Sequence, residues 1–197
     1  MQPVQIADPQ EVELISRSIR GDPAAWESLV ATHQEVVFRL AYLFLGSGQE
    51  AQDVAQETFI RAFLRLDQFD VSRPVRPWLL AIAANLAKNR RRSIARYLGR
   101  VRLLGDRQTA EQFSPVESQS ESDLAAKDLW KAVGKLKQPD QELIYLRYFL
   151  ELSTEEAAET MQIPTGTVKS RLHRAVAKLR RIIQREYPLL VEMMQNE

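Results

Sequence analysis

The chain has 197 residues, of which 45% are hydrophobic and none is cysteine. This composition is sufficient for a core, while the lack of cysteine excludes disulfides and thiolate metal sites. No run of about 18 apolar residues marks a membrane span, and residues 1–10 do not resemble a signal peptide. The sequence therefore predicts a cytoplasmic protein that is not inserted in a membrane and needs no cofactor.

The formal net charge of +1 conceals a strong segregation of charge along the chain. Residues 61–107 contain 12 basic and 3 acidic residues, and residues 166–197 contain 7 and 3. The segments 1–60 and 108–165 are acidic, each with a net charge of −6. Because a basic segment is typical of a nucleic-acid contact, two separate basic segments predict two DNA contacts in one chain.

Three helices are predicted in the acidic N-terminal segment and just beyond it, over residues 11–19, 23–45 and 49–66. Asp22 and Pro23 are typical of a helix N-cap and of the first helical position, so they mark the start of the second helix. A Gly-Ser-Gly sequence separates the second helix from the third. The apolar spacing in all three helices predicts one buried face on each.

The outer surface of the third predicted helix carries Asp53, Gln56 and Glu57. Asp53 and Glu57 are four residues apart and therefore share a face. One interpretation is an ordinary solvated acidic surface. Two carboxylates can also act as general acid and base, but no His, Cys or Ser nucleophile accompanies them. Phe59 lies on the side of this helix that is expected to face the core.

A fourth helix is predicted to open at Trp78, after a loop over residues 67–77. Its apolar stripe includes Leu79 and Leu86, and four polar residues lie together on the opposite side, namely Asn85, Lys88, Asn89 and Arg92. Asn can recognise base edges, while Lys and Arg hold phosphates. The run of arginines over residues 90–92 is expected to extend this positive surface, so the helix predicts a nucleic-acid contact.

The segment after this helix is polar, rich in Ser, Gln and Glu, and without a convincing period. It predicts a flexible linker over residues 101–122, which joins two small helical domains over residues 10–100 and 123–190. No alternating strand pattern is convincing, so the expected fold class is all-α. The second domain is expected to begin with helices over residues 123–136 and 139–150.

The stretch over residues 153–183 is predicted to form two helices joined by a tight turn. Ser153 is a good N-cap, and Glu156 three residues later completes a capping box. Pro164 interrupts the first helix because it lacks a backbone N–H. Thr165 or Thr167 is expected to cap the second helix, and Ala158 supplies the small residue needed where two helices cross closely.

The second helix of this pair has an apolar face and a polar face at helical spacing. The polar face carries Lys169, Ser170, His173 and Arg174, with Arg171 and Lys178 on its flank. A single basic helix favours an ordinary solvated face. The capping box, small residue, proline turn and basic helix together are typical of a helix-turn-helix, in which the second helix enters the DNA major groove.

Two other classes of function are alternatives to DNA binding in a larger assembly. A stand-alone helix-turn-helix regulator would bind duplex DNA as a dimer, but it leaves the basic helix with its asparagines unexplained. An enzyme is disfavoured because the only histidines are His33 and His173, and no Gly-rich phosphate loop, nucleophile triad or metal-ligand cluster is present. His33 is expected to be partly exposed or at the edge of the core.

Three motifs in order carry a resemblance to a known family. They are DVAQETFIRAF at residues 53–63, RPWLLAIAANLAKNRRR at 76–92 and LSTEEAAETMQIPTGTVKSRLHRA at 152–175. Together they resemble the extracytoplasmic-function (ECF) group of bacterial RNA polymerase sigma factors, over about residues 10–185. The resemblance implies a promoter-specificity subunit that directs core RNA polymerase to promoter DNA and initiates melting, rather than an enzyme.

The resemblance assigns a role to each face of the first domain, which corresponds to sigma region two. Asp53, Gln56, Glu57 and Phe59 match the segment that docks on the coiled coil of the polymerase beta-prime subunit. The helix around Asn85, Lys88, Asn89 and Arg92 matches the one that recognises the minus-ten element and captures unpaired bases of the non-template strand.

The second domain corresponds to sigma region four, which recognises the minus-thirty-five element and contacts the beta flap. Lys169, Ser170, His173 and Arg174 match the positions that contact bases, whereas the flanking Arg171 is assigned to phosphate or an intrachain contact. The resemblance also implies an anti-sigma factor as partner. The family usually has Gly in the turn where this chain has Gln162, and left-handed geometry there costs Gln roughly 1 kcal/mol.

Overall fold

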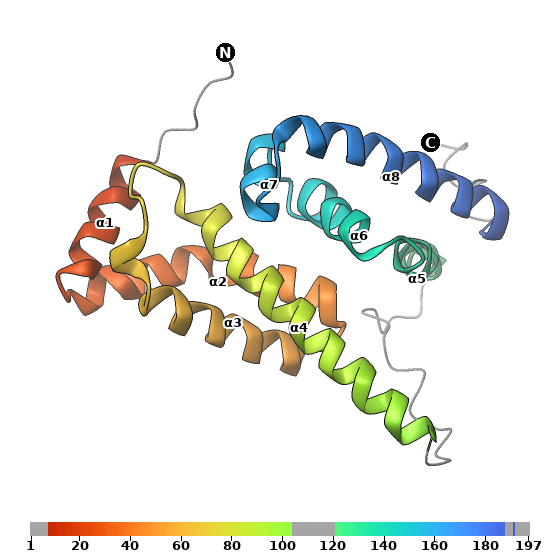
Figure 1. The fold of residues 1–197 in the computed structure, drawn as a ribbon, viewed down its shortest axis with the longest axis horizontal. Helices are drawn as coiled ribbons and strands as arrows, with labels where there is room; N and C mark the ends of the chain where they lie inside the picture. Colours follow the sequence, from red (N-terminus) through yellow and green to blue (C-terminus); the bar gives the residue numbers. More distant parts are fainter. Residues whose placement is uncertain (1–7, 104–120, 188–190, 192–197) are drawn as a thin grey trace. The chain divides into compact units, whose positions relative to one another are not determined.

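The computed structural model describes residues 8–103, 121–187 and 191 (Figure 1). All secondary structure within these residues is helical, which confirms the expected all-α class. Along the chain, the boundary between two compact units falls between Arg100 and Val101. Of the linker predicted over residues 101–122, residues 101–103 end one helix, residues 121 and 122 begin the next, and residues 104–120 lie outside the described residues. None of the described helices is long and apolar enough to cross a membrane.

The N-terminal unit contains four α-helices and a short 3-10 helix. They are α1 (Pro9–Ile19), α2 (Pro23–Leu45), α3 (Gly48–Phe63), η1 (Leu66–Gln68) and α4 (Val75–Leu103). The prediction for α2 is confirmed at both ends, while α3 ends earlier than predicted and α4 begins three residues before Trp78. Pro77 is compatible with the first turn of α4 because no intrahelical partner is available there for a backbone N–H.

Side-chain caps set the start of α2. The Asp22 carboxylate accepts hydrogen bonds from the backbone N–H groups of Ala24 and Ala25, at 3.0 and 3.3 Å. The same carboxylate accepts a 2.8 Å hydrogen bond from Arg17 Nε, near the end of α1. These bonds, first the one from Arg17, lower the pKa of Asp22 below its usual value. The cap therefore also fastens α1 to α2.

Residues from α2, α3 and α4 form the core of this unit, and Leu40, Leu45 and Leu80 are completely buried. Of the two expectations for His33, the structure contradicts partial exposure, because only 4% of the residue is exposed. Its Nε2 lies 2.9 Å from Glu11 Oε1. Because α1 packs on α2 and places Glu11 beside Nε2, His33 is buried between the two helices rather than exposed.

The C-terminal unit contains α5 (Glu121–Gly134), α6 (Gln138–Ile144), a π-helical turn η2 (Tyr145–Phe149), α7 (Thr154–Met161) and α8 (Thr165–Glu186). The single helix predicted over residues 139–150 is therefore divided into α6 and η2. The buried Gln141 side chain stabilises the connection before it, because its Nε2 donates to the carbonyls of Gly134 and Leu136 at 2.8 and 2.9 Å. A buried carbonyl without such a partner is costly.

The helix-turn-helix predicted from the sequence is formed by α7 and α8. Ser153 and Glu156 form the reciprocal capping box, with a 2.7 Å bond from Ser153 N–H to Glu156 Oε2 and a 3.0 Å bond from Glu156 N–H to Ser153 Oγ. Ala158, at the position predicted for a small residue, is buried. The capping box fixes the start of α7. The small side chain of Ala158 allows another helix to approach α7 closely.

The turn between α7 and α8 confirms one expectation and corrects another. Gln162 has a φ of 55°, so it occupies the left-handed region usually filled by Gly. The N–H of Ile163 then donates to the Ala158 carbonyl at 3.0 Å, which closes the end of α7. Neither Thr165 nor Thr167 caps α8: both lie inside the helix, and Pro164 is the N-cap residue.

Candidate nucleic-acid and protein interfaces

The polar face of α8 lies on the outside of the C-terminal unit. Val168, Ala175 and Ile183 are buried and hold the helix against its neighbours. The residues predicted to contact bases are all exposed, namely Lys169, Ser170, His173 and Arg174. Arg171 and Lys178 are half-buried on the flank, where the sequence placed them.

On the polar face of α8, the hydrogen bonds that the structure defines for the residues predicted to contact bases are local. Ser170 Oγ donates to the Thr167 carbonyl at 3.2 Å, and Arg174 Nε donates to the Ser170 carbonyl at 3.2 Å. Both acceptors belong to the same helix. Such exposed bonds contribute little to folding, so these side chains can turn to a ligand without disturbing the core.

The predicted nucleic-acid face of α4 is also present in the N-terminal unit. Asn85, Asn89 and Arg92 are exposed, and Lys88 is half-buried. Arg92 Nη2 donates to Asn89 Oδ1 at 2.5 Å, so the amide and the guanidinium form one polar group on the surface. This arrangement offers hydrogen-bond donors and a positive charge together, as contact with bases and a phosphate backbone requires.

The three consecutive arginines of α4 do not form one continuous positive surface, which corrects the sequence-based expectation. Arg90 forms an ion pair with Glu50 of α3, and its Nη2 lies 3.6 Å from Asp53 Oδ2. Arg91 lies over the Phe44 ring of α2, with 6.0 Å between Cζ and the ring centroid. The hydrogen bond to Glu50 and its negative charge raise the pKa of Arg90 above its usual value.

The acidic face of α3 contains most of the residues predicted for docking. Asp53 and Gln56 are exposed, and Glu57 is half-buried and accepts a 2.7 Å hydrogen bond from Arg61 Nε. Phe59 differs from the other three because only 9% of it is exposed, and its ring packs edge-on against Trp26 at 6.3 Å. Phe59 therefore belongs mainly to the core, as its helical phase predicted.

A shallow hollow of about 510 Å³ nevertheless reaches Phe59 between α2 and α3. Its lining combines apolar and amide side chains with one carboxylate, and includes Val30, Gln34, Glu35, Phe38, Gln52 and Gln56. The exposed Phe38 ring stacks on Tyr42 at 6.1 Å. The hollow adjoins the acidic face through Gln56, so the two form one surface.

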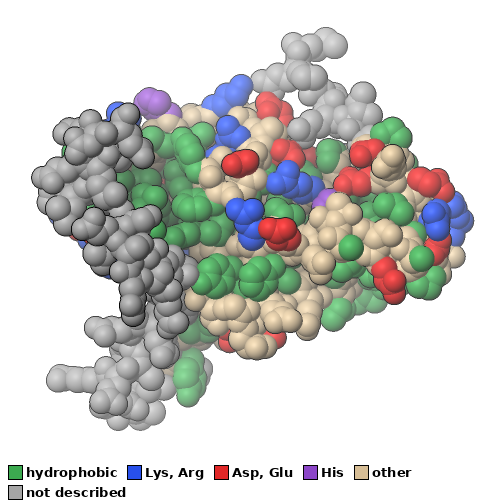
Figure 2. All heavy atoms as spheres, turned by 180° about the vertical axis from the view of Figure 1, so that it is seen from behind, with side chains coloured by type: hydrophobic (Ala, Val, Ile, Leu, Met, Phe, Trp, Pro, Cys, Tyr) green, Lys and Arg blue, Asp and Glu red, His purple; other side chains and the backbone are tan. Residues whose placement is uncertain are grey.

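Sequence reasoning missed three large apolar side chains on α3 and just after it. Ile60, Phe63 and Leu64 are 56%, 51% and 70% exposed. Figure 2 shows one face of the molecule, on which apolar areas lie between acidic and basic side chains. The available signal was the apolar spacing of FIRAFLRL, which continues beyond the stripe that the core requires. Exposed apolar side chains of this kind are typical of a protein contact.

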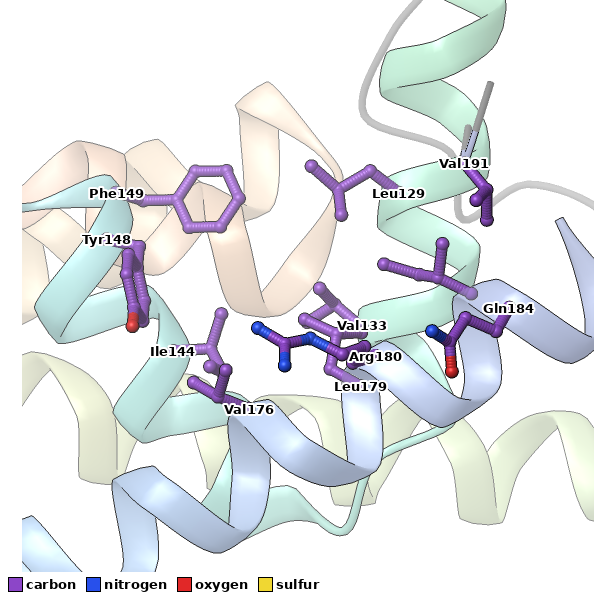
Figure 3. Close-up of a pocket in the computed structure, with 11 residues that line it drawn as sticks. Leu129, Val133, Ile144, Tyr148, Phe149, Val176, Leu179, Arg180, Gln184 and Val191 are labelled. Atoms are coloured by element: carbon purple, nitrogen blue, oxygen red, sulfur yellow. The ribbon is translucent and has the colours of Figure 1, made fainter. Parts of the chain in front are cut away.

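The C-terminal unit has an apolar groove of about 660 Å³ (Figure 3). Leu129 and Val133 of α5, Tyr148 and Phe149 of η2, and Leu179 of α8 point toward it, while Arg180 lies among these apolar side chains. The π-helical turn adds a residue to the local winding and so changes the direction of Tyr148 and Phe149. Val191, beyond α8, also lines the groove and packs on the Ala132 and Ile183 cluster.

Comparison with known proteins identifies the family. Residues 29–97 match the model for Sigma-70 region 2, and residues 126–179 match that for Sigma-70, region 4. The ECF RNA polymerase sigma factor SigW of Bacillus subtilis is 34% identical over 170 residues, which cover 82% of this chain and 90% of SigW. The chain belongs to the ECF RNA polymerase sigma factors.

Two further relatives agree with this assignment. The RNA polymerase sigma-H factor of Pseudomonas aeruginosa is 33% identical over 191 residues, covering 93% of this chain and 97% of that factor. The solved structure of CnrH in complex with the cytosolic domain of CnrY superposes with a TM-score of 0.68 and 25% identity, covering 90% of this chain and 99% of CnrH.

Three candidate surfaces of this sigma factor lie within the matched regions. The region 2 match extends from Leu29 in α2, through α3, to Tyr97 in α4, and so contains the acidic face and the Asn-containing face. The region 4 match extends through Leu179 and contains the polar face of α8. Among the residues that the structure describes, no group of three or more His, Cys, Asp or Glu is arranged to hold a metal ion.

Proposed function

We propose that the two units divide the work of promoter recognition. The C-terminal unit, over about residues 123–190, binds the duplex minus-thirty-five element through α8. The N-terminal unit, over about residues 10–100, docks on polymerase and captures the melted minus-ten element through α4. The observation that carries the proposal is that each unit presents its own polar, cationic helix face, within a chain that belongs to the sigma factors.

The case for α8 rests on its exposed residues and on the contacts that fix its direction. Lys169, Ser170, His173 and Arg174 offer donors and positive charge on the side opposite the buried Val168 and Ala175. The capping box of α7 and the closed turn hold α8 in a fixed direction. Arg can form two hydrogen bonds with guanine in the major groove, and Arg171 and Lys178 on the flank are suited to phosphates.

The case for α4 rests on asparagine side chains that share a helix face with cationic side chains. Asn85 and Asn89 can form hydrogen bonds with base edges, while Lys88 and Arg92 attract the strand backbone. A base exposed by melting has lost its stacking and pairing, at a cost of a few kcal/mol. Contacts that exist only with an unpaired base offset part of that cost, and therefore favour the melted promoter.

The α3 surface and the C-terminal groove supply two separate contacts with polymerase. Asp53, Gln56 and Glu57, bordered by the exposed Ile60 and Phe63, form a mixed acidic and apolar surface for the beta-prime coiled coil. The groove lined by Leu129, Phe149 and Leu179 fits an apolar segment of the beta flap. Apolar contacts surrounded by polar residues are typical of specific protein interfaces.

A sigma factor of this kind is regulatory rather than catalytic and acts in the cytoplasm, where promoter DNA and polymerase are located. We expect an anti-sigma factor to cover the same surfaces. The CnrH structure contains the cytosolic domain of CnrY, so a chain with this fold can bind a second protein. The stand-alone dimeric regulator is not favoured, because the similar proteins are polymerase sigma factors along both units.

The proposed function is tested with the full chain and purified core RNA polymerase. We expect a stable complex in gel filtration, and new initiation sites in run-off transcription from a genomic fragment library. The protein alone is expected to bind duplex DNA weakly. Absence of the complex, together with tight duplex binding by the protein alone, would favour the stand-alone regulator.

The docking surface is tested by charge reversal with a matched control. Asp53→Arg should weaken binding to core polymerase by at least about tenfold, because it places a cation in the proposed contact. Glu13→Arg on α1 is the control, since each carboxylate lies 3.6 Å from an arginine, Arg90 and Arg20 respectively. Surface plasmon resonance against immobilised core enzyme measures both. Equal losses in the two variants would contradict this location of the docking surface.

A further inference from the structure

Arg90 makes contacts that nucleic-acid binding does not explain. Its guanidinium belongs to α4 but forms an ion pair with Glu50, 40 positions earlier in the chain, at the start of α3. Its Nη2 also lies 3.6 Å from Asp53, one turn further along α3. Figure 1 shows α3 and α4 running side by side in this part of the unit. Arg90 thus spans the two helices.

The direction of Arg90 determines which way the candidate minus-ten face points. A helix turns by roughly 100° per residue. Asn85, Asn89 and Arg92 therefore lie on the side of α4 away from Arg90. When Arg90 is held by Glu50 and Asp53, these three residues point outward. A rotation of α4 that broke the ion pair would move the Asn residues toward α3.

We propose that Arg90 is a positioning residue, which fixes the rotation of α4 on α3 so that Asn85, Asn89 and Arg92 meet the melted strand. Through Asp53, the same contact joins this helix to the docking surface of α3. The inference rests on the proposed function of both surfaces. It assigns to Arg90 an orienting role inside the protein, and not a contact with DNA phosphate.

The solvent exposure of the Arg90–Glu50 ion pair limits the effect expected from breaking it. The side chains of Arg90 and Glu50 are 46% and 29% exposed, so water and salt screen their attraction. The pair therefore contributes little to the overall stability of the fold. Its effect should appear as a several-fold change in promoter opening, and not as loss of the folded protein.

The first test compares Arg90→Gln with Arg92→Gln, which remove the same charge two residues apart. The measurement is the affinity of the holoenzyme for a promoter fragment at a series of salt concentrations, followed by the rate of open-complex formation. Arg92→Gln should reduce the slope of log K against log salt by about 1, because a phosphate contact is lost. Arg90→Gln should leave the slope unchanged and slow opening about threefold to tenfold. An equal reduction of the slope by Arg90→Gln would overturn the proposal.

The second test exchanges the two charges. Glu50→Arg and Arg90→Glu should each slow opening, and the double variant should recover most of the wild-type rate because the ion pair is restored in reverse. A double variant no faster than the single variants would refute the orienting role. Arg90→Lys keeps the charge but lacks the second nitrogen that lies near Asp53. Its rate of opening should fall between those of Arg90→Gln and wild type.

A measurement on the protein without polymerase separates this inference from the proposed function. Amide hydrogen exchange in α4 should increase in Arg90→Gln and return in the charge-exchanged double variant. Unchanged exchange in all variants would refute the link between α3 and α4, even for a protein that initiates transcription. Failure of the wild-type protein to bind core polymerase would refute the proposed function instead. The hydrogen-exchange result would still show whether Arg90 links α4 to α3.

Discussion

The two basic helices, α4 and α8, use their charged side chains in different ways. On α8 the buried residues recur at helical spacing, so Lys169, Ser170, His173 and Arg174 all remain on the outside. On α4 three arginines are consecutive, and consecutive helical positions point in different directions. Arg90 consequently contacts α3, and Arg91 lies over Phe44 of α2.

The difference shows that the charge of a segment and the charge that it presents to a ligand are separate quantities. The segment over residues 61–107 is the most basic part of the chain, yet part of its charge is neutralised by Glu50 and Asp53. The α4 face then depends on amides as well as on cations. We therefore expect α8 to respond to changes of single charges, and α4 to respond more strongly to changes of its asparagines.

The largest effect is expected from the asparagines of α4. Asn85→Ala with Asn89→Ala should reduce open-complex formation by roughly 10- to 100-fold, because hydrogen bonds to unpaired bases are lost. A template that is mismatched across the minus-ten element should restore most of the activity, since unstacking no longer has to be offset. Permanganate footprinting on both templates measures this. Equal losses on the two templates would indicate that these residues bind the duplex before melting.

On α8, Arg174→Ala should cost about 1–3 kcal/mol in discrimination among minus-thirty-five sequences if the guanidinium contacts a base. Lys178→Ala on the flank is the control. It should weaken binding to all sequences alike and reduce the salt slope by about 1. Competition binding of holoenzyme to a set of promoter variants separates the two outcomes. A uniform loss with Arg174→Ala would identify Arg174 as a phosphate contact.

Local signals in the sequence predicted the elements that depend on local chemistry. Asp22 and Pro23 gave the start of α2, and the Ser153 and Glu156 spacing gave the capping box of α7. The left-handed geometry of Gln162 was suggested by the family resemblance, because the family usually has Gly at this position. In each case the stabilising bonds join residues that are close in the sequence, so the pattern contains the information.

Features that depend on contacts between distant residues were not predicted. The burial of His33 depends on Glu11 of another helix, and the direction of Arg90 depends on Glu50, 40 positions away. The two ends of the π-helical turn contact Trp130 of another helix, whose ring lies 5.7 Å from that of Tyr145 and 4.7 Å from that of Phe149. Helical periodicity identifies a face, but it does not specify which partner the face meets.

A smaller effect is expected from the turn before α8, which helps to fix the direction of that helix. Gln162→Gly should raise the free energy of unfolding by about 1 kcal/mol at most, because Gly adopts a positive φ without the cost that Gln bears. Gln162→Val should lower it, since a β-branched residue is strained in this region. Urea denaturation measures both. Promoter affinity should remain unchanged with Gly, and a loss of affinity would mean that Gln162 itself contacts DNA.

The smallest effect is expected from Arg91, the second arginine of α4 that is turned inward. Its guanidinium lies 6.0 Å from the centroid of the buried Phe44 ring. Arg91→Met retains an unbranched stem and removes the cation, so it should lower the free energy of unfolding by about 0.5–1 kcal/mol. Arg96→Met, at an exposed position of the same helix, should change it by less. If both substitutions have equal effects, the contact between Arg91 and the Phe44 ring does not stabilise α4.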